Sequence, residues 1–133
     1  MKKFIYETNY DKMVRLGINK FLYGKEQYIK VENEPYMALH IDKIRMEGNN
    51  HIISIAHNGE QNGDNMADPD MELRILPDVK MVEALTYQND FMHVYQQVYS
   101  EDGKQFNPKL KISMNNFLGT WLNNLLKQGF KIN

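Results

Sequence analysis

Residues 116–130 read Asn-Phe-Leu-Gly-Thr-Trp-Leu-Asn-Asn-Leu-Leu-Lys-Gln-Gly-Phe, and this run sets what the rest of the chain must provide. Ser113 or Asn115 is a suitable helix N-cap, and Gly129 can take the left-handed conformation that ends a helix. A helix with a wide apolar face must bury that face, and a sheet is the expected partner. The apolar side chains recur at helical spacing, at Phe117, Leu118, Trp121, Leu122, Leu125 and Leu126.

The segments before this helix have the pattern of strands. They alternate apolar and polar residues or are rich in β-branched residues, and short turns separate them. Strands joined by short turns favour antiparallel pairing. A further helix is predicted over residues 9–22, after a capping-box spacing at residues 8–11. The sequence therefore predicts an α+β fold, an antiparallel sheet of about five strands packed by N-terminal and C-terminal helices. The candidate strand segments are residues 36–44, 51–57, 71–76, 80–88 and 91–99, together with residues 27–32, which alternate only weakly.

Length and composition limit the class of protein. A chain of 133 residues suits one domain, residues 1–133, and the absence of cysteine excludes disulfides and thiolate metal ligands. No apolar run approaches the ~18 residues that a membrane span needs. Met1-Lys2-Lys3 looks like the start of a signal peptide, but no apolar core follows it. A cytoplasmic location is expected.

The charge distribution gives no global argument for nucleic acid or membrane as a partner. The net charge is −1, with basic ends and an acidic middle. Residues 1–30 hold seven Lys/Arg against three acids, and residues 57–72 hold five acids and no Lys/Arg. Charge runs are usually solvated faces. Binding of nucleic acid through the basic ends stays as a third hypothesis, and it would weaken steeply with salt.

Residues 57–72 are predicted to form a long polar loop and supply the candidate site. Carboxylates are ligands for hard cations, but the spacing is not that of an EF-hand. The segment is open to three interpretations: a solvated connection, a metal site, or a loop that binds a ligand or partner. Long loops in compact domains are often functional. The predicted ligand- or partner-binding residues are His57, Glu60, Asp64, Asp68, Asp70 and Glu72.

Other side chains give weaker indications of chemistry. The histidines His40, His51, His57 and His93 show no short metal-binding spacing. Glu72 and Glu83 would be a candidate acid–base pair if they shared one face of the sheet. No nucleophile elbow, P-loop or dinucleotide motif is present, so no cofactor is expected.

Aromatic residues alternate along residues 91–99. Phe91, Tyr95 and Tyr99 could stack nucleic-acid bases on an open sheet if Lys or Arg accompanied them. Residues 91–100 hold neither. These aromatic side chains are therefore predicted to pack in the core beneath a helix.

The run at residues 116–130 resembles the C-terminal segment of the uncharacterised YqiB-like bacterial family. Tyr6-Glu7-Thr8-Asn9-Tyr10 and Pro35-Tyr36 are similar to that family's start and to one of its strand starts, and residues 70–74 and 83–84 fit its central strands. Gln61-Asn62-Gly63-Asp64 together with Asp68-Pro69-Asp70 resembles more closely a second uncharacterised family, common on plasmids, phages and other mobile elements. Neither resemblance implies an activity, a catalytic residue or a cofactor.

These observations favour a small non-enzymatic binding or accessory protein that acts on another protein through residues 57–72. The resemblances imply that it is encoded by bacteria or their mobile elements. The alternative is a metal-assisted hydrolase that uses Asp64, Asp68, Asp70 and His57. The pattern assigns neither an enzyme class nor an oligomeric state.

Overall fold

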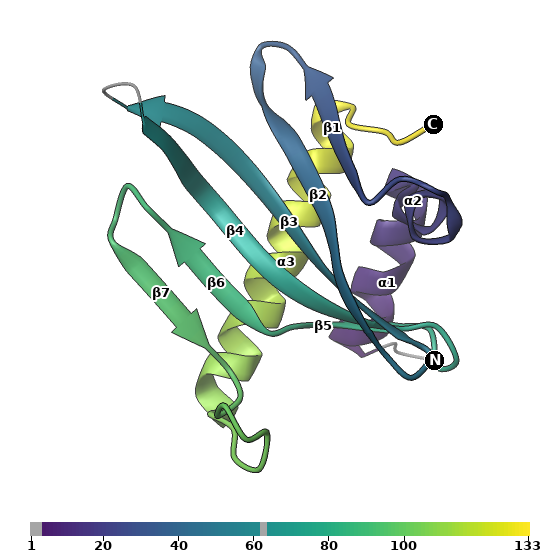
Figure 1. The fold of residues 1–133 in the computed structure, drawn as a ribbon, viewed down its shortest axis with the longest axis vertical. Helices are drawn as coiled ribbons and strands as arrows, with labels where there is room; N and C mark the ends of the chain where they lie inside the picture. The colour runs from purple at the N-terminus through teal and green to yellow at the C-terminus, as the bar shows by residue number, and fades with distance from the viewer. Residues whose placement is uncertain (1–3, 62–63) are drawn as a thin grey trace.

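The computed structural model describes residues 4–61 and 64–133. Over these residues the strands form an antiparallel seven-stranded sheet in the order β1-β2-β3-β4-β6-β7, and β5 also pairs with β4 (Figure 1). The predicted α+β class is confirmed, with more strands than the five expected. The elements are α1 (Ile5–Leu16), α2 (Ile18–Tyr23), β1 (Tyr28–Asn33), β2 (Tyr36–Glu47), β3 (Asn50–Gln61), β4 (Asp64–Leu76), β5 (Met81–Ala84), β6 (Thr86–Asn89), β7 (Val94–Gln97) and α3 (Pro108–Gln128).

Helix α3 buries its apolar face against the sheet, as the pattern predicts. Leu118, Leu122 and Leu125 are almost completely buried, and they belong to one core with the inward residues of β2, β3 and β4. Gly129 ends the helix at φ 90°, and the amide of Phe130 donates to the carbonyl of Leu125. This closure is the one expected of a left-handed glycine stop.

The start of α3 differs from the prediction. The helix begins at Pro108, and its N-cap is Asn107, whose side chain accepts a hydrogen bond from the amide of Leu110. Proline is favoured in the first helical turn because its missing N–H is not needed there. Asn115, one of the two predicted caps, is instead fully buried, and its side chain accepts a hydrogen bond from the amide of Ala84 in β5.

The helix predicted over residues 9–22 is two helices separated at Gly17, and the first begins at Ile5, before the predicted capping box at residues 8–11. Gly17 has φ 90°, and the amide of Ile132 donates to the carbonyl of Leu16 at 2.8 Å. A Cβ atom at position 17 would lie 2.3 Å from the carbonyl oxygen of Ile132. The break therefore lets the C-terminal segment pass against the backbone at the end of α1.

The prediction of a long loop over residues 57–72 is wrong. This segment is the outer half of the β3–β4 hairpin, where Asn58–Gln61 pair with Asp64–Ala67. Residues 62 and 63 lie outside the described residues. Asn, Asp and Gly are poor strand formers in isolation, so the composition indicated a loop. The backbone pairing that begins in the apolar half of the hairpin continues through these residues and overrides that preference.

The last predicted strands are shorter than expected, and their aromatic residues lie elsewhere. Residues 80–88 divide into β5 and β6, which pair with successive parts of β4. Phe91 lies in the turn before β7 and is 39% exposed, and Tyr95 is 58% exposed. The prediction that both pack in the core is wrong. Tyr99 is half-buried and packs at the margin of the core.

Candidate functional site: the open face of the sheet

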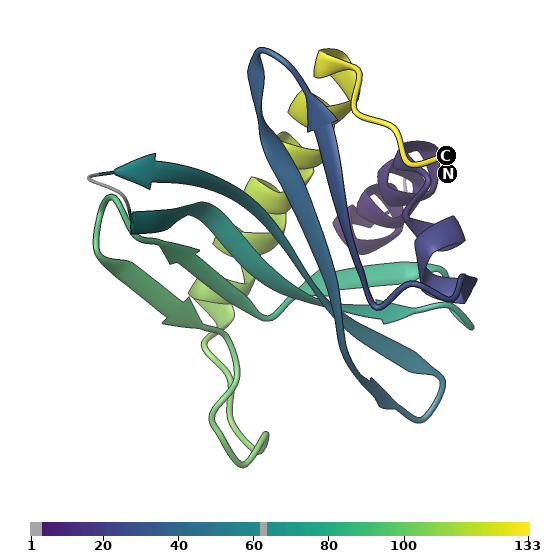
Figure 2. The ribbon, with the colours of Figure 1, turned by 45° about the horizontal axis from the view of Figure 1, so that its top comes forward.

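The two faces of the sheet have different chemistry. Successive side chains of a strand point to opposite faces, so the buried residues of β2–β4 alternate with polar ones. Helices α1 and α3 lie on the apolar side (Figures 1 and 2). We call the other side the open face. It presents His40, Asp42 and Arg45 of β2, Ser54 of β3, Asp70, Glu72 and Arg74 of β4, Thr86 and Gln88 of β6, and Gln97 of β7.

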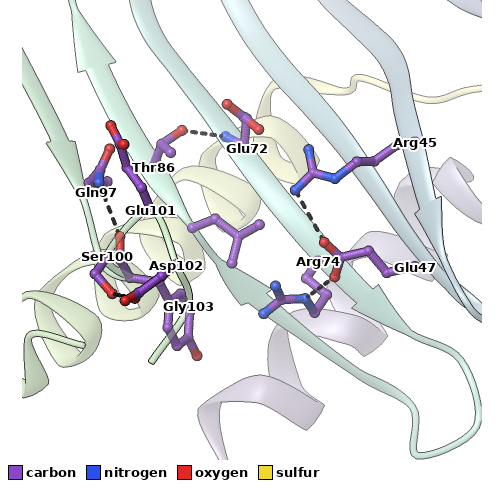
Figure 3. A pocket seen from close by; sticks show the side chains of 12 residues that line it. Arg45, Glu47, Glu72, Arg74, Thr86, Gln97, Ser100, Glu101, Asp102 and Gly103 are labelled. Carbon is purple, nitrogen blue, oxygen red and sulfur yellow. Dashed lines mark hydrogen bonds and ion pairs between the residues drawn. The ribbon is translucent and has the colours of Figure 1, made fainter. Parts of the chain in front are cut away.

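The open face contains a cavity of about 390 Å³ (Figure 3). Arg45 and Glu47 line it from β2, Glu72 and Arg74 from β4, and residues 99–103 from the loop after β7. This volume lies within the range of small-ligand pockets, about 300–1,000 Å³. Most of the lining residues are polar or charged, so hydrogen bonds and charge would orient a ligand held here.

An alternating row of charges runs from α3 to β2 along one end of this cavity. Lys111 of α3 lies 3.6 Å from Glu83 of β5, and Glu83 contacts Arg74. Arg74 lies 3.0 Å from Glu47, and Glu47 lies 3.2 Å from Arg45. We call these five residues the ion chain. Each of its carboxylates lies between two cations, so the interior of the chain is internally compensated.

Tyr99 joins the ion chain to the loop that lines the cavity. Its hydroxyl lies 3.2 Å from both carboxylate oxygens of Glu83 and accepts a hydrogen bond from Lys111 at 2.9 Å. Lys111 also lies over the rings of Tyr99, Tyr6 and Phe106, at 5.3–5.7 Å. Burial lowers the pKa of Lys111, but the hydrogen bond to Tyr99 and the charge of Glu83 outweigh it and raise that pKa.

Several carboxylates lie close together at the centre of the open face. Asp42 and Glu72 flank Ser54 on the two strands next to β3, and Asp70 pairs with Gln88, whose amide donates to Asp90 at 2.7 Å. Burial, followed by the charges of Glu72, Asp42 and Asp90, raises the pKa of Asp70 to about 6. We call Asp42, Asp70, Glu72 and Asp90 the acidic cluster.

The structure separates the six predicted site residues. Asp70 and Glu72 lie on the open face, whereas His57 is 8% exposed and packs between Trp121 and Phe130 under α3. Burial lowers the pKa of His57. Asp68 accepts a hydrogen bond from the buried Asn89 at 2.8 Å. The backbones of Glu60 and Asp64 belong to the ladder of the β3–β4 hairpin, each paired with another residue. Their side chains are outside the described part of the structure.

A bulge explains this separation. Ala56 pairs with Asp70 and Asn58 with Ala67, so one residue of β3 lies opposite two of β4. An extra residue reverses the alternation of side chains beyond it. Asp68 and Asp70 would share a face in a regular strand, and here they do not.

The remaining predictions of chemistry have clear structural outcomes. Glu72 and Glu83 share the open face, but Glu83 is engaged by Arg74, Lys111 and Tyr99. Among the side chains that the structure describes, no three His, Asp or Glu residues are grouped so that they could hold a metal ion. Among the helices described, none is long and apolar enough to cross a membrane.

Reasoning from the sequence missed the ion chain. The clean alternation of residues 71–76 places Glu72 and Arg74 on one face, and that signal was available. Arg45, Glu47, Tyr99 and Lys111 had no such signal, because their meeting depends on the register between distant strands and on where α3 begins.

Comparisons with known proteins identify a family and no activity. No curated protein and no solved structure is significantly similar to this chain. A family model described as a domain of unknown function, DUF6908, matches residues 9–131. Because that match covers most of the sequence, the chain belongs to the DUF6908 family.

Proposed function

We propose that this protein is a small binding module that holds a positively charged segment of another protein on the open face of its sheet. The observation that carries the proposal is the acidic cluster. Burial, followed by repulsion from the neighbouring carboxylates, raises the pKa of Asp70 to about 6. A Lys or Arg side chain placed among them would relieve that repulsion.

The chemistry of the face favours a basic protein segment over other ligands. Phosphate groups of nucleic acid would meet the acidic cluster with like charge, so the backbone attraction that drives nucleic-acid binding is missing here. The cavity of about 390 Å³ adjoins the cluster at Glu72, and the polar side chains of Thr86 in β6 and Gln97 in β7 offer hydrogen bonds there. A flexible basic segment fits these features.

The proposal keeps the sequence-based site in part. Asp70 and Glu72 are its central residues. His57 and Asp68 would support the strand from the helix side. In keeping with the resemblance to uncharacterised families of bacteria, plasmids and phages, we propose a cytoplasmic accessory role, without catalysis.

Fluorescence anisotropy with labelled hexalysine and hexaglutamate tests this function at low salt. We expect hexalysine alone to bind, and Asp70→Asn and Glu72→Gln each to weaken its binding by about fivefold. Asp78→Asn is the matched control, because it removes one negative charge at the exposed β4–β5 turn. Equal binding of the two peptides, or equal weakening by Asp78→Asn, would overturn the proposal.

A further inference from the structure

The ion chain ends in a cation that is less engaged than the others. Arg74 contacts two carboxylates, those of Glu47 and Glu83, and Lys111 contacts Glu83 and Tyr99. Arg45 contacts Glu47 through Nη2, and its side chain is 51% exposed. A guanidinium group has five N–H donors in a fork that matches a carboxylate. Arg45 therefore has donors to offer at the rim of the cavity.

The ion chain has more positive than negative charges. Its three cations, Arg45, Arg74 and Lys111, face two carboxylates, those of Glu47 and Glu83. Arg74 lies between two acids, and Lys111 is 24% exposed and lies against three aromatic rings, so Arg45 is the more exposed terminal cation of the ion chain. An anion placed next to Arg45 would complete the alternation.

The same cavity presents the opposite charge on its other side. Arg45 pairs with Ile52 of β3, which pairs with Arg74 of β4, and Glu72 lies two residues along β4. Strands are spaced by about 4.8 Å, so Arg45 lies about 10 Å across the sheet from the strand that carries Glu72. Figure 3 shows Arg45 extending from β2 toward that strand over the cavity. A positive and a negative anchor thus line one cavity of about 390 Å³.

We infer that the bound segment carries a carboxylate beside its positive charge, and that Arg45 binds the carboxylate while Glu72 binds the cation. This inference rests on the proposed function and narrows the ligand class. Two sources supply such a group: the free C-terminus of a chain that ends in Lys or Arg, or an Asp or Glu next to a basic residue. A simple cation satisfies one anchor and leaves Arg45 without its partner.

Three N-acetylated peptides with one common sequence and a single lysine test the inference by calorimetry. The first ends in Lys with a free carboxylate, the second ends in Lys amide, and the third ends in Lys-Glu amide. We expect the first or the third to bind about tenfold more tightly than the second. Tighter binding of the first identifies a C-terminus as the source, and tighter binding of the third identifies a side-chain carboxylate.

Arg45→Gln should reduce this preference to less than about twofold, and Arg45→Lys, which keeps the charge but loses the fork, should retain part of it. Arg15→Gln is the matched control, because Arg15 is exposed on α1, on the helix side of the sheet. If the wild type binds all three peptides equally, or Arg45→Gln keeps the preference, the inference is wrong while the proposed function stands. If none of the three peptides binds while hexalysine does, the inference alone is wrong, and if hexalysine also fails to bind, both are wrong.

Discussion

The ion chain and the acidic cluster lie side by side on the same face, and they use charge in opposite ways. In the chain, carboxylates alternate with cations, and Glu83 is 15% exposed with two cations and a tyrosine hydroxyl around it. In the cluster, Asp70 is half-buried among three other carboxylates. Both arrangements involve β4, through Arg74 in the chain and through Asp70 and Glu72 in the cluster. The comparison leads us to expect that the ion chain stabilises the fold, whereas the acidic cluster, which carries the proposed function, lowers its stability.

The largest effect on stability should come from removing Glu83 from the ion chain. Glu83→Ala leaves Arg74 and Lys111, each 24% exposed, without their shared carboxylate. We expect the free energy of unfolding to fall by about 2–3 kcal/mol, measured by urea denaturation. Tyr99→Phe, which removes the hydroxyl next to Glu83, should cost about 1 kcal/mol. A loss below about 0.5 kcal/mol in Glu83→Ala would show that the chain does not hold the fold.

The acidic cluster should respond in the opposite direction. Asp70→Asn removes a carboxyl group whose pKa is about 6 in the folded protein and 3.8 as the unperturbed value. Because the folded state holds this proton more tightly, wild-type stability falls as pH rises from about 4 to about 7. We expect the variant to be more stable by about 1–2 kcal/mol near neutral pH and to lose that advantage below about pH 4.

Urea denaturation of both proteins across this pH range checks the cluster prediction. A gain that is constant with pH would show that the amide improves packing and that the charge of Asp70 has no part in the effect. A loss near neutral pH would show that the ionised carboxylate stabilises the fold.

The smallest effect on stability should come from the exposed end of the ion chain, at Arg45. Arg45→Gln removes one ion pair from a side chain that is 51% exposed, and such pairs contribute little. We expect a change in the free energy of unfolding below about 0.5 kcal/mol, measured in the same urea titration. A loss as large as that of Glu83→Ala would make Arg45 a structural residue and remove the contrast between the two ends of the chain.

The sequence predicts the parts of this structure that depend on local pattern. The structure contains the apolar face of α3 and the alternation of residues 71–76, which are periodic signals. It also contains the helix stop at Gly129, which is a single-residue signal. Local pattern misses what the tertiary contacts decide. The polar residues 58–61 extend a ladder that apolar residues start, and the bulge at His57 puts Asp68 and Asp70 on opposite faces.

The ion chain shows a second limit of local pattern. Its members come from β2, β4, β5 and α3, and no spacing along the sequence brings them together. Glu83 was singled out as a possible acid, but its partners Arg74 and Lys111 follow from strand register and from the early start of α3 at Pro108. Sites of this kind require the fold before they can be found.

The hydrogen bond from Ile132 to Leu16 joins segments that lie far apart along the chain. Closing so long a loop costs conformational entropy, and contacts of this separation slow folding. The contact also holds the C-terminal segment against α1, with Ile132 buried. Hydrogen exchange at the amide of Ile132 should therefore be slow, and its rate should report how often this segment separates from α1.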